Sequence, residues 1–75
     1  MRFKTKLESY NISEKCVANI YVTEDNCNYV FEVIYGDNFK FERLFLNNDL
    51  GMSKMEECKD KYKTESKVLE YFGLK

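Results

Sequence analysis

The chain has 75 residues, 44% of them hydrophobic and 16% aromatic, and a formal net charge of −1 from twelve Lys and Arg and thirteen Asp and Glu. This length allows one domain and no second core, and the absence of proline together with only three glycines excludes a low-complexity chain. The near-neutral charge argues against a nonspecific nucleic-acid binder, because such proteins usually carry a strong basic excess.

The first predicted strand covers residues 2–9, where two kinds of side chain alternate. One set contains Phe3, Thr5, Leu7 and Ser9, and the other, which is charged throughout, contains Arg2, Lys4, Lys6 and Glu8. Alternation of this kind is typical of a half-exposed strand. The polar residues from Tyr10 to Glu14 then predict a turn.

Two further strands are predicted over residues 16–23 and 29–35, joined by a polar loop of hairpin length at residues 24–28. The first of them has one apolar face, made by Cys16, Ala18, Ile20 and Val22. The second is largely apolar on both faces, with Tyr29, Phe31, Val33 and Tyr35 on one and Val30, Glu32 and Ile34 on the other. We therefore expect residues 29–35 to form a central strand that is covered on each side.

A turn at Gly36–Asn38 precedes the fourth predicted strand, residues 39–46, because glycine and asparagine tolerate positive φ. Its two faces carry Phe39, Phe41, Arg43 and Phe45 against Lys40, Glu42, Leu44 and Leu46. Short loops between successive strands favour an antiparallel meander.

The C-terminal third predicts a helix. The sheet ends at residues 47–51, and Ser53 with Glu56 matches a capping box. Apolar residues then recur at helical spacing, and Gly73 is placed as the C-terminal cap: Met55, Cys58, Tyr62, Leu69 and Phe72. Residues 63–67 interrupt this stripe, but no Pro or Gly lies there, so we expect one continuous helix. The predicted fold is a single α+β domain over residues 1–75, a four-stranded antiparallel β-meander followed by a C-terminal α-helix packed on one sheet face (ββββα).

The residue inventory argues against an enzyme. The chain has no histidine, so neither a Ser-His-Asp nor a Cys-His arrangement can be built within it. Cys16, Cys27 and Cys58 are too few and too scattered for a zinc site, and the three glycines form no phosphate-binding loop. Acidic residues of the predicted hairpin loops are interpreted as solvated turn residues. We expect no catalytic residue, no metal and no cofactor.

The cysteines and the N-terminus indicate a reducing compartment. An odd number of widely spaced cysteines does not predict disulfides. The basic start has no apolar segment behind it, and no stretch approaches the roughly 20 apolar residues of a membrane span. We therefore expect a cytoplasmic protein without membrane association.

The apolar surface of the predicted sheet is the main indication of function. One helix covers one face, yet the other face also carries apolar side chains, so a partner is expected there. The partner is either a larger protein or a second copy in a homodimer. Tyr, Phe and Arg are enriched at interface hot spots, so the candidate anchors are Tyr21, Tyr35, Phe41 and Arg43.

A nucleic-acid-binding regulator is the alternative hypothesis. Its possible phosphate contacts are Arg2, Lys4, Lys6, Lys59 and Lys63. The same residues are equally interpreted as solvated charges paired with nearby acids.

In its size, mild acidity and richness in Asn, Lys, Tyr and Phe, the chain resembles small accessory proteins of AT-rich bacteria and their phages. This resemblance implies a protein that binds and blocks a host enzyme or a defence complex, of the anti-CRISPR or anti-restriction type. The leading hypothesis is thus a non-catalytic, inhibitory protein-binding module.

Overall fold

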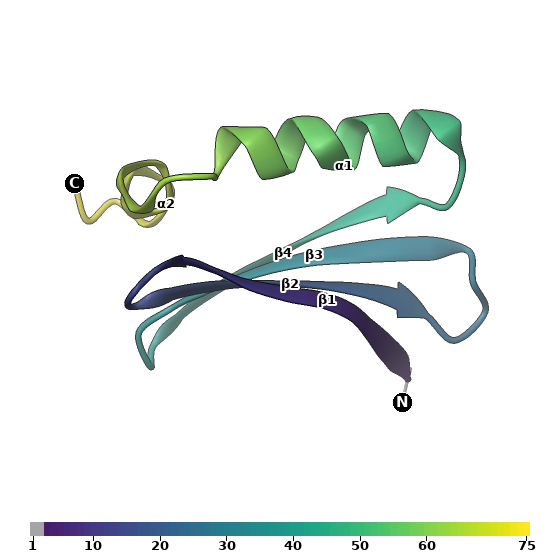
Figure 1. The fold of residues 1–75 in the computed structure, drawn as a ribbon, viewed down its shortest axis with the longest axis horizontal. Coiled ribbons are helices and arrows are strands. Elements are labelled where there is room, and N and C mark those ends of the chain that lie inside the picture. The colour runs from purple at the N-terminus through teal and green to yellow at the C-terminus, as the bar shows by residue number, and fades with distance from the viewer. Residues whose placement is uncertain (1–2) are drawn as a thin grey trace.

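The computed structural model describes residues 3–75. Strands β1 (Lys4–Ser13), β2 (Cys16–Thr23), β3 (Asn28–Tyr35) and β4 (Phe39–Leu46) form one antiparallel sheet in chain order. Helices α1 (Asp49–Lys61) and α2 (Glu65–Phe72) follow, and both lie on the same side of this sheet (Figure 1). The predicted α+β meander is confirmed. Among the described elements, no helix covers the second sheet face.

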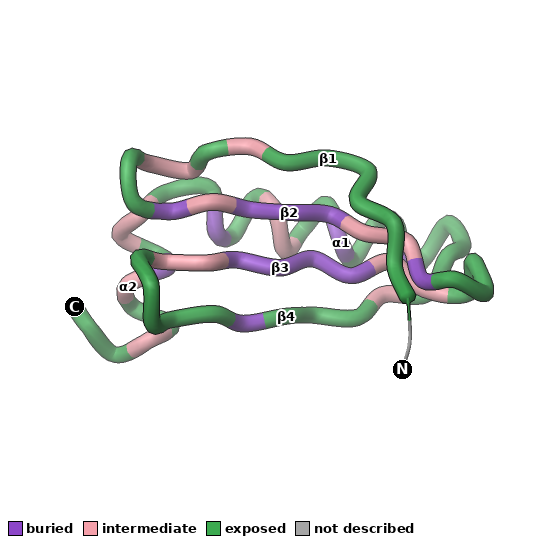
Figure 2. Tube along the Cα trace, turned by 90° about the horizontal axis from the view of Figure 1, so that it is seen from below, coloured by how far each residue is buried: buried purple, intermediate pink, exposed green. Residues whose placement is uncertain are grey.

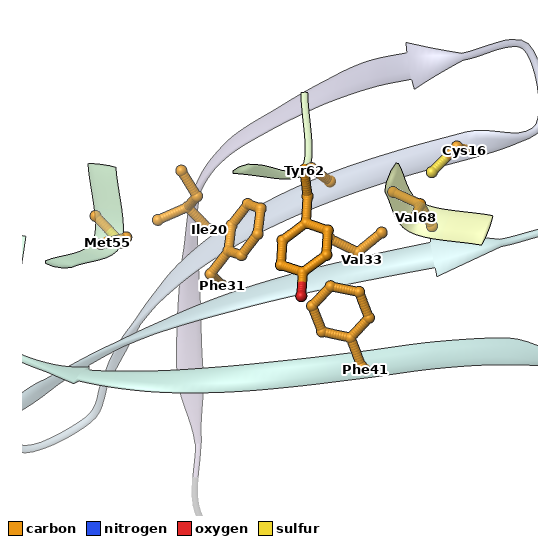
Figure 3. Close-up of a cluster of buried hydrophobic side chains, with 9 residues drawn as sticks. Cys16, Ile20, Phe31, Val33, Phe41, Met55, Tyr62 and Val68 are labelled. Atoms are coloured by element: carbon orange, nitrogen blue, oxygen red, sulfur yellow. The ribbon is translucent and has the colours of Figure 1, made fainter. Parts of the chain in front are cut away.

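The core lies between the helices and the two inner strands. Figure 2 shows that most buried positions of the sheet belong to β2 and β3. The core residues are Cys16, Ala18, Ile20, Phe31, Val33, Phe41, Met55, Tyr62 and Val68. In Figure 3, Tyr62 at the end of α1 points toward Phe41 of β4, and their ring centroids are 5.0 Å apart. Full burial of a side chain such as Phe31 stabilises the fold by roughly 1.5–3 kcal/mol.

Strand β1 differs from its prediction in length and in phase. It continues to Ser13, so the predicted turn over Tyr10–Glu14 is wrong. A register shift leaves Leu7 as an extra residue: Lys6 lies opposite Tyr21, and Glu8 lies opposite Ile20. Glu8 therefore shares the helix-facing side, contrary to the predicted common face with Lys4 and Lys6. The predicted first residue of this strand, Arg2, lies outside the described residues.

Helix α1 begins one turn earlier than the predicted capping box. Asn48 is the N-cap, and its side chain accepts a hydrogen bond of 2.7 Å from the Gly51 amide. Ser53 lies inside the helix, so its predicted role as cap is wrong. The capping oxygen is supplied by an asparagine that directly follows the turn out of β4.

The predicted single helix is two helices. α1 ends at its C-cap Tyr62, and α2 begins after Thr64, whose hydroxyl accepts a hydrogen bond of 3.4 Å from the Lys67 amide. One helix from Asp49 to Phe72 would be about 36 Å long, whereas a strand of eight residues spans about 26 Å. Its last turns would have extended past the sheet. The predicted C-cap Gly73 is confirmed, with φ of 73°.

Candidate functional site

We define the open face as the side of the sheet that faces away from α1 and α2. Side chains alternate between the two faces along each strand. On the inner strands and β4, the open face comprises Val17, Asn19, Tyr21, Thr23, Asn28, Val30, Glu32, Ile34, Lys40, Glu42, Leu44 and Leu46. Strand β1 adds Lys4, Lys6, Ser9 and Asn11.

A buried carboxylate lies at the centre of the open face. The side chain of Glu32 is only 7% exposed, although no described helix covers it. Its Oε1 accepts hydrogen bonds from Asn19 Nδ2 at 3.0 Å and from the Tyr21 hydroxyl at 3.1 Å. Its Oε2 lies 3.8 Å from Lys40 Nζ. These partners satisfy a charge that would otherwise be expensive to bury.

A second carboxylate lies next to the first on the same face. Glu42 of β4 is directly opposite Glu32 of β3, an arrangement that is repulsive by itself. Two ammonium groups compensate, since Lys40 Nζ is 3.5 Å and Lys4 Nζ 3.8 Å from Glu42 Oε1. Lys4 Nζ also lies 4.2 Å from the centre of the Tyr21 ring. The centre of the open face is thus a network of alternating charges that fixes these side chains.

An apolar patch borders this network at one end of the sheet. A hollow of about 230 Å³ is lined by Phe3, Lys4, Thr23, Val30, Glu42 and Leu44. Phe3 and Leu44 are each 62% exposed, and Leu46, the next open-face residue of β4, is 57% exposed. Isolated exposed apolar side chains are ordinary, but two that line one hollow, with a third nearby on the same strand, indicate a contact surface.

The structure does not bring the four predicted anchors together. Tyr21 lies on the open face, within the Glu32 network. Tyr35, Phe41 and Arg43 lie on the helix-facing side. Phe41 is a core residue, 6% exposed, and offers little surface to a partner. The guanidinium of Arg43 lies 5.6 Å from the centre of the Phe41 ring.

The predicted phosphate contacts do not form one patch either. Lys4 and Lys6 lie on the open face, whereas Lys59 and Lys63 belong to the helix side. Lys59 Nζ is 3.6 Å from Glu8 and 3.4 Å from Glu56, and Lys63 is 3.3 Å from Asp60. Arg2 lies outside the described residues.

A hollow of about 300 Å³ lies at the junction of the helices, lined by Lys61, Tyr62, Lys67, Glu70 and Tyr71. Although larger, it has a mostly charged rim, in which Lys67 already pairs with Glu70 at 3.7 Å. The open face combines apolar exposure with fixed polar groups, so it is the better candidate.

Within residues 3–75, no group of three or more His, Cys, Asp or Glu side chains could hold a metal ion. Asp25 accepts hydrogen bonds from the Thr23 hydroxyl at 2.7 Å and from the Cys27 amide at 2.9 Å, contacts that order the β2–β3 loop. Burial raises the pKa of the Cys16 and Cys58 thiols, which keeps them protonated.

No helix in the described part of the chain is long and apolar enough to cross a membrane. No family model, no curated protein and no solved structure matches the chain.

Sequence alternation placed Leu44 and Leu46 on the same side of the fourth strand as Lys40 and Glu42, but it did not identify the network around Glu32. One signal was present in the sequence: Glu32 is the only charged residue within the apolar run from Tyr29 to Tyr35. Its partners come from β2 and β4, so only the strand register brings them to it.

Proposed function

We propose that the protein is a non-catalytic binding module that docks onto a larger protein through the open face. The observation that carries this proposal is the exposure of Phe3 and Leu44, which line a hollow on the sheet face that no described helix covers, together with the exposed Leu46 two residues further along β4. Burying such side chains supplies affinity in proportion to the apolar area removed from water. The absence of histidine from the sequence supports the non-catalytic part of the proposal.

The two parts of the open face have different roles in this proposal. The apolar patch supplies most of the affinity, and the Glu32 network sets specificity. Tyr21 is held by its hydrogen bond to Glu32 and Lys4 lies over its ring, so a complementary surface meets these two side chains with less loss of side-chain entropy. A partner that covers Lys4 or Lys40 with apolar surface removes water from an ammonium group without replacing its hydrogen bonds, and this desolvation penalty rejects poorly matched surfaces.

The size of the face constrains the complex. Four strands spaced about 4.8 Å apart and about 26 Å long present roughly 500 Å² in projection. Stable complexes bury about 800 Å² on each partner. The target therefore also contacts residues beyond the four strands, such as the exposed loops at residues 24–27 and 36–38 at the ends of the sheet. A module of this kind inhibits a larger enzyme or a defence complex by covering its working surface, the role implied by the resemblance to phage accessory proteins.

Two leucines provide a matched test of the open face. Leu44 of β4 and Leu50 of α1 are 62% and 67% exposed, but only Leu44 lies on the open face. The experiment is a quantitative pull-down from a nuclease-treated lysate of the natural host, comparing wild type, Leu44→Glu and Leu50→Glu. We expect Leu44→Glu to recover at least about tenfold less target than wild type, because a carboxylate would be buried in the complex in place of a leucine. Leu50→Glu should recover it normally.

Equal recovery by both variants would contradict the proposal. A target that disappears on nuclease treatment would favour the nucleic-acid alternative, whose affinity should also fall steeply as salt rises.

A further inference from the structure

The two edges of the sheet differ in how well they are protected against pairing with another strand. Natural proteins protect edges with lysines and with bulges that interrupt the regular ladder. β1 has both: its register with β2 shifts twice, between Lys6 and Glu8 and between Asn11 and Ser13. β4 pairs with β3 over eight consecutive positions, from Leu46 to Phe39, without a shift. Its outer edge is therefore a regular template for an added strand.

The charges of β4 select one occupant for that edge. Around Phe41 the sequence reads Phe39-Lys40-Phe41-Glu42-Arg43. When two such strands run antiparallel with Phe41 opposite Phe41, each Lys40 lies opposite Glu42 of the other copy, on the open face. On the helix-facing side each Phe39 lies opposite Arg43, a cation–aromatic pair. The segment is complementary to itself in this register.

Neighbouring registers are disfavoured. Centring the pair on Lys40, Glu42 or Arg43 would place each of these residues opposite its own copy, and like charges directly opposite are destabilising. The Phe41 register also offsets the repulsion between the Glu32 and Glu42 carboxylates of one chain. Glu42 already lies opposite Glu32 on β3, so a Lys40 from a second copy completes a row of two acids and a base.

We propose that the chain forms a two-fold dimer in which the β4 strands of two copies pair antiparallel about Phe41. The two four-stranded sheets become one continuous sheet of eight strands. Both pairs of helices then lie on one side, and both open faces join on the other. The exposed rings of Phe39 and Tyr71, 36% and 41% exposed, lie on the helix side near this edge and become partly covered. This dimer does not depend on the larger target proposed for the open face.

A charge swap tests the register. In the double variant Lys40→Glu/Glu42→Lys, each Glu at position 40 lies opposite a Lys at position 42, so the variant should dimerise as wild type does. In a mixed dimer of the double variant and wild type, however, the wild-type Lys40 lies opposite a lysine at position 42, and the wild-type Glu42 lies opposite a glutamate at position 40. We expect the mixed dimer to be at least about tenfold weaker than either homodimer. Sedimentation equilibrium measures the homodimers, and native mass spectrometry with ¹⁵N-labelled wild type detects the mixed species.

Lys6→Glu is the matched control, because it reverses a charge on the open face at the opposite edge. It should dimerise and should mix freely with wild type. A wild-type chain that stays monomeric at all concentrations would overturn the proposal. So would a double variant that mixes with wild type as readily as it self-associates. Because the swapped pair remains together on one strand, the double variant keeps an acid and a base beside Glu32 and should fold, which circular dichroism checks.

Discussion

Glu32 is the residue on which the open face is organised. A carboxylate that accepts two side-chain hydrogen bonds while 7% exposed stabilises the sheet only while those donors are present. We predict that Glu32→Gln lowers the free energy of unfolding by about 1–2 kcal/mol, because it removes charge-assisted bonds and leaves an amide near Lys40. Urea unfolding measures this change.

The control for this prediction is Glu57→Gln. Glu57 on α1 is 69% exposed and lies 3.7 Å from Lys54, so its replacement should change stability by less than about 0.5 kcal/mol. Tyr21→Phe, which removes one donor to Glu32, should fall between the two, at about 1 kcal/mol. Equal stability of the Glu32 and Glu57 variants would show that the network contributes nothing.

At the scale of elements, the turn from β4 into α1 depends on a glycine. A Cβ at Gly51 would lie 1.8 Å from the carbonyl oxygen of Leu46, so the helix must move to admit any side chain. Gly→Ala inside a helix normally stabilises by roughly 1 kcal/mol. Here we predict a loss of about 2 kcal/mol or more for Gly51→Ala, seen as a lower thermal midpoint.

Ser53→Ala gives the comparison for Gly51→Ala, since Ser53 is an exposed residue in the same helix. It should be neutral or slightly stabilising, by a few tenths of a kcal/mol. If Gly51→Ala behaved in the same way, the close packing of α1 on the end of β4 would be refuted.

The break between the helices illustrates what the sequence did and did not determine. The strands and their order follow from alternation and short loops, and Gly73 was recognisable as a C-cap. The break between α1 and α2 was not recognisable, because the helical spacing of apolar residues continues from Tyr62 to Leu69. Val68 lies about 120° around a continuous helix from Tyr62, yet it is fully buried. The sheet is shorter than a continuous helix would be, and because of this tertiary constraint the chain turns before α2, so that Val68 faces the core.

At the scale of the molecule, the pKa values of five groups among residues 3–75 shift in the same direction, upward. Burial raises the pKa of Cys16, Cys58, Tyr10 and Tyr21, and in Tyr21 the hydrogen bond to Glu32 adds to it. Partial burial by itself lowers the pKa of Lys59, but the nearby carboxylates of Glu8 and Glu56 outweigh this effect, so the pKa of Lys59 is raised. A raised folded-state pKa contributes stability that is present below the unfolded pKa and lost as pH rises through the folded one.

We therefore predict that stability falls as pH rises above about 8.5, where unfolded cysteines begin to ionise. Thermal melts across the alkaline range measure this fall. Cys16→Ala, which removes the fully buried thiol, should make the early part of the fall shallower. Stability that stayed constant or rose between about pH 8.5 and 11 would contradict the shared direction of these shifts.

The candidate site was predictable only in part at this scale. Sequence alternation placed apolar residues such as Leu44 on a second face and implied that one helical layer leaves it open. It did not separate exposed from enclosed residues, so Phe41 was selected as an anchor although it packs against Tyr62 and Tyr71. Aromatic content alone does not distinguish a core from an interface, because both bury the same side chains.

Lysine acetylation of the captured complex tests the docking face most directly. Lys4 and Lys6 lie on the open face, whereas Lys54 and Lys63 lie on the helix side, and all four side chains are free to react to some extent in the isolated chain. We predict that binding of the target slows acetylation of Lys4 and Lys6 and leaves Lys54 and Lys63 unchanged. Protection of Lys54 and Lys63 with unchanged Lys4 and Lys6 would place the target on the helices and contradict the proposed function.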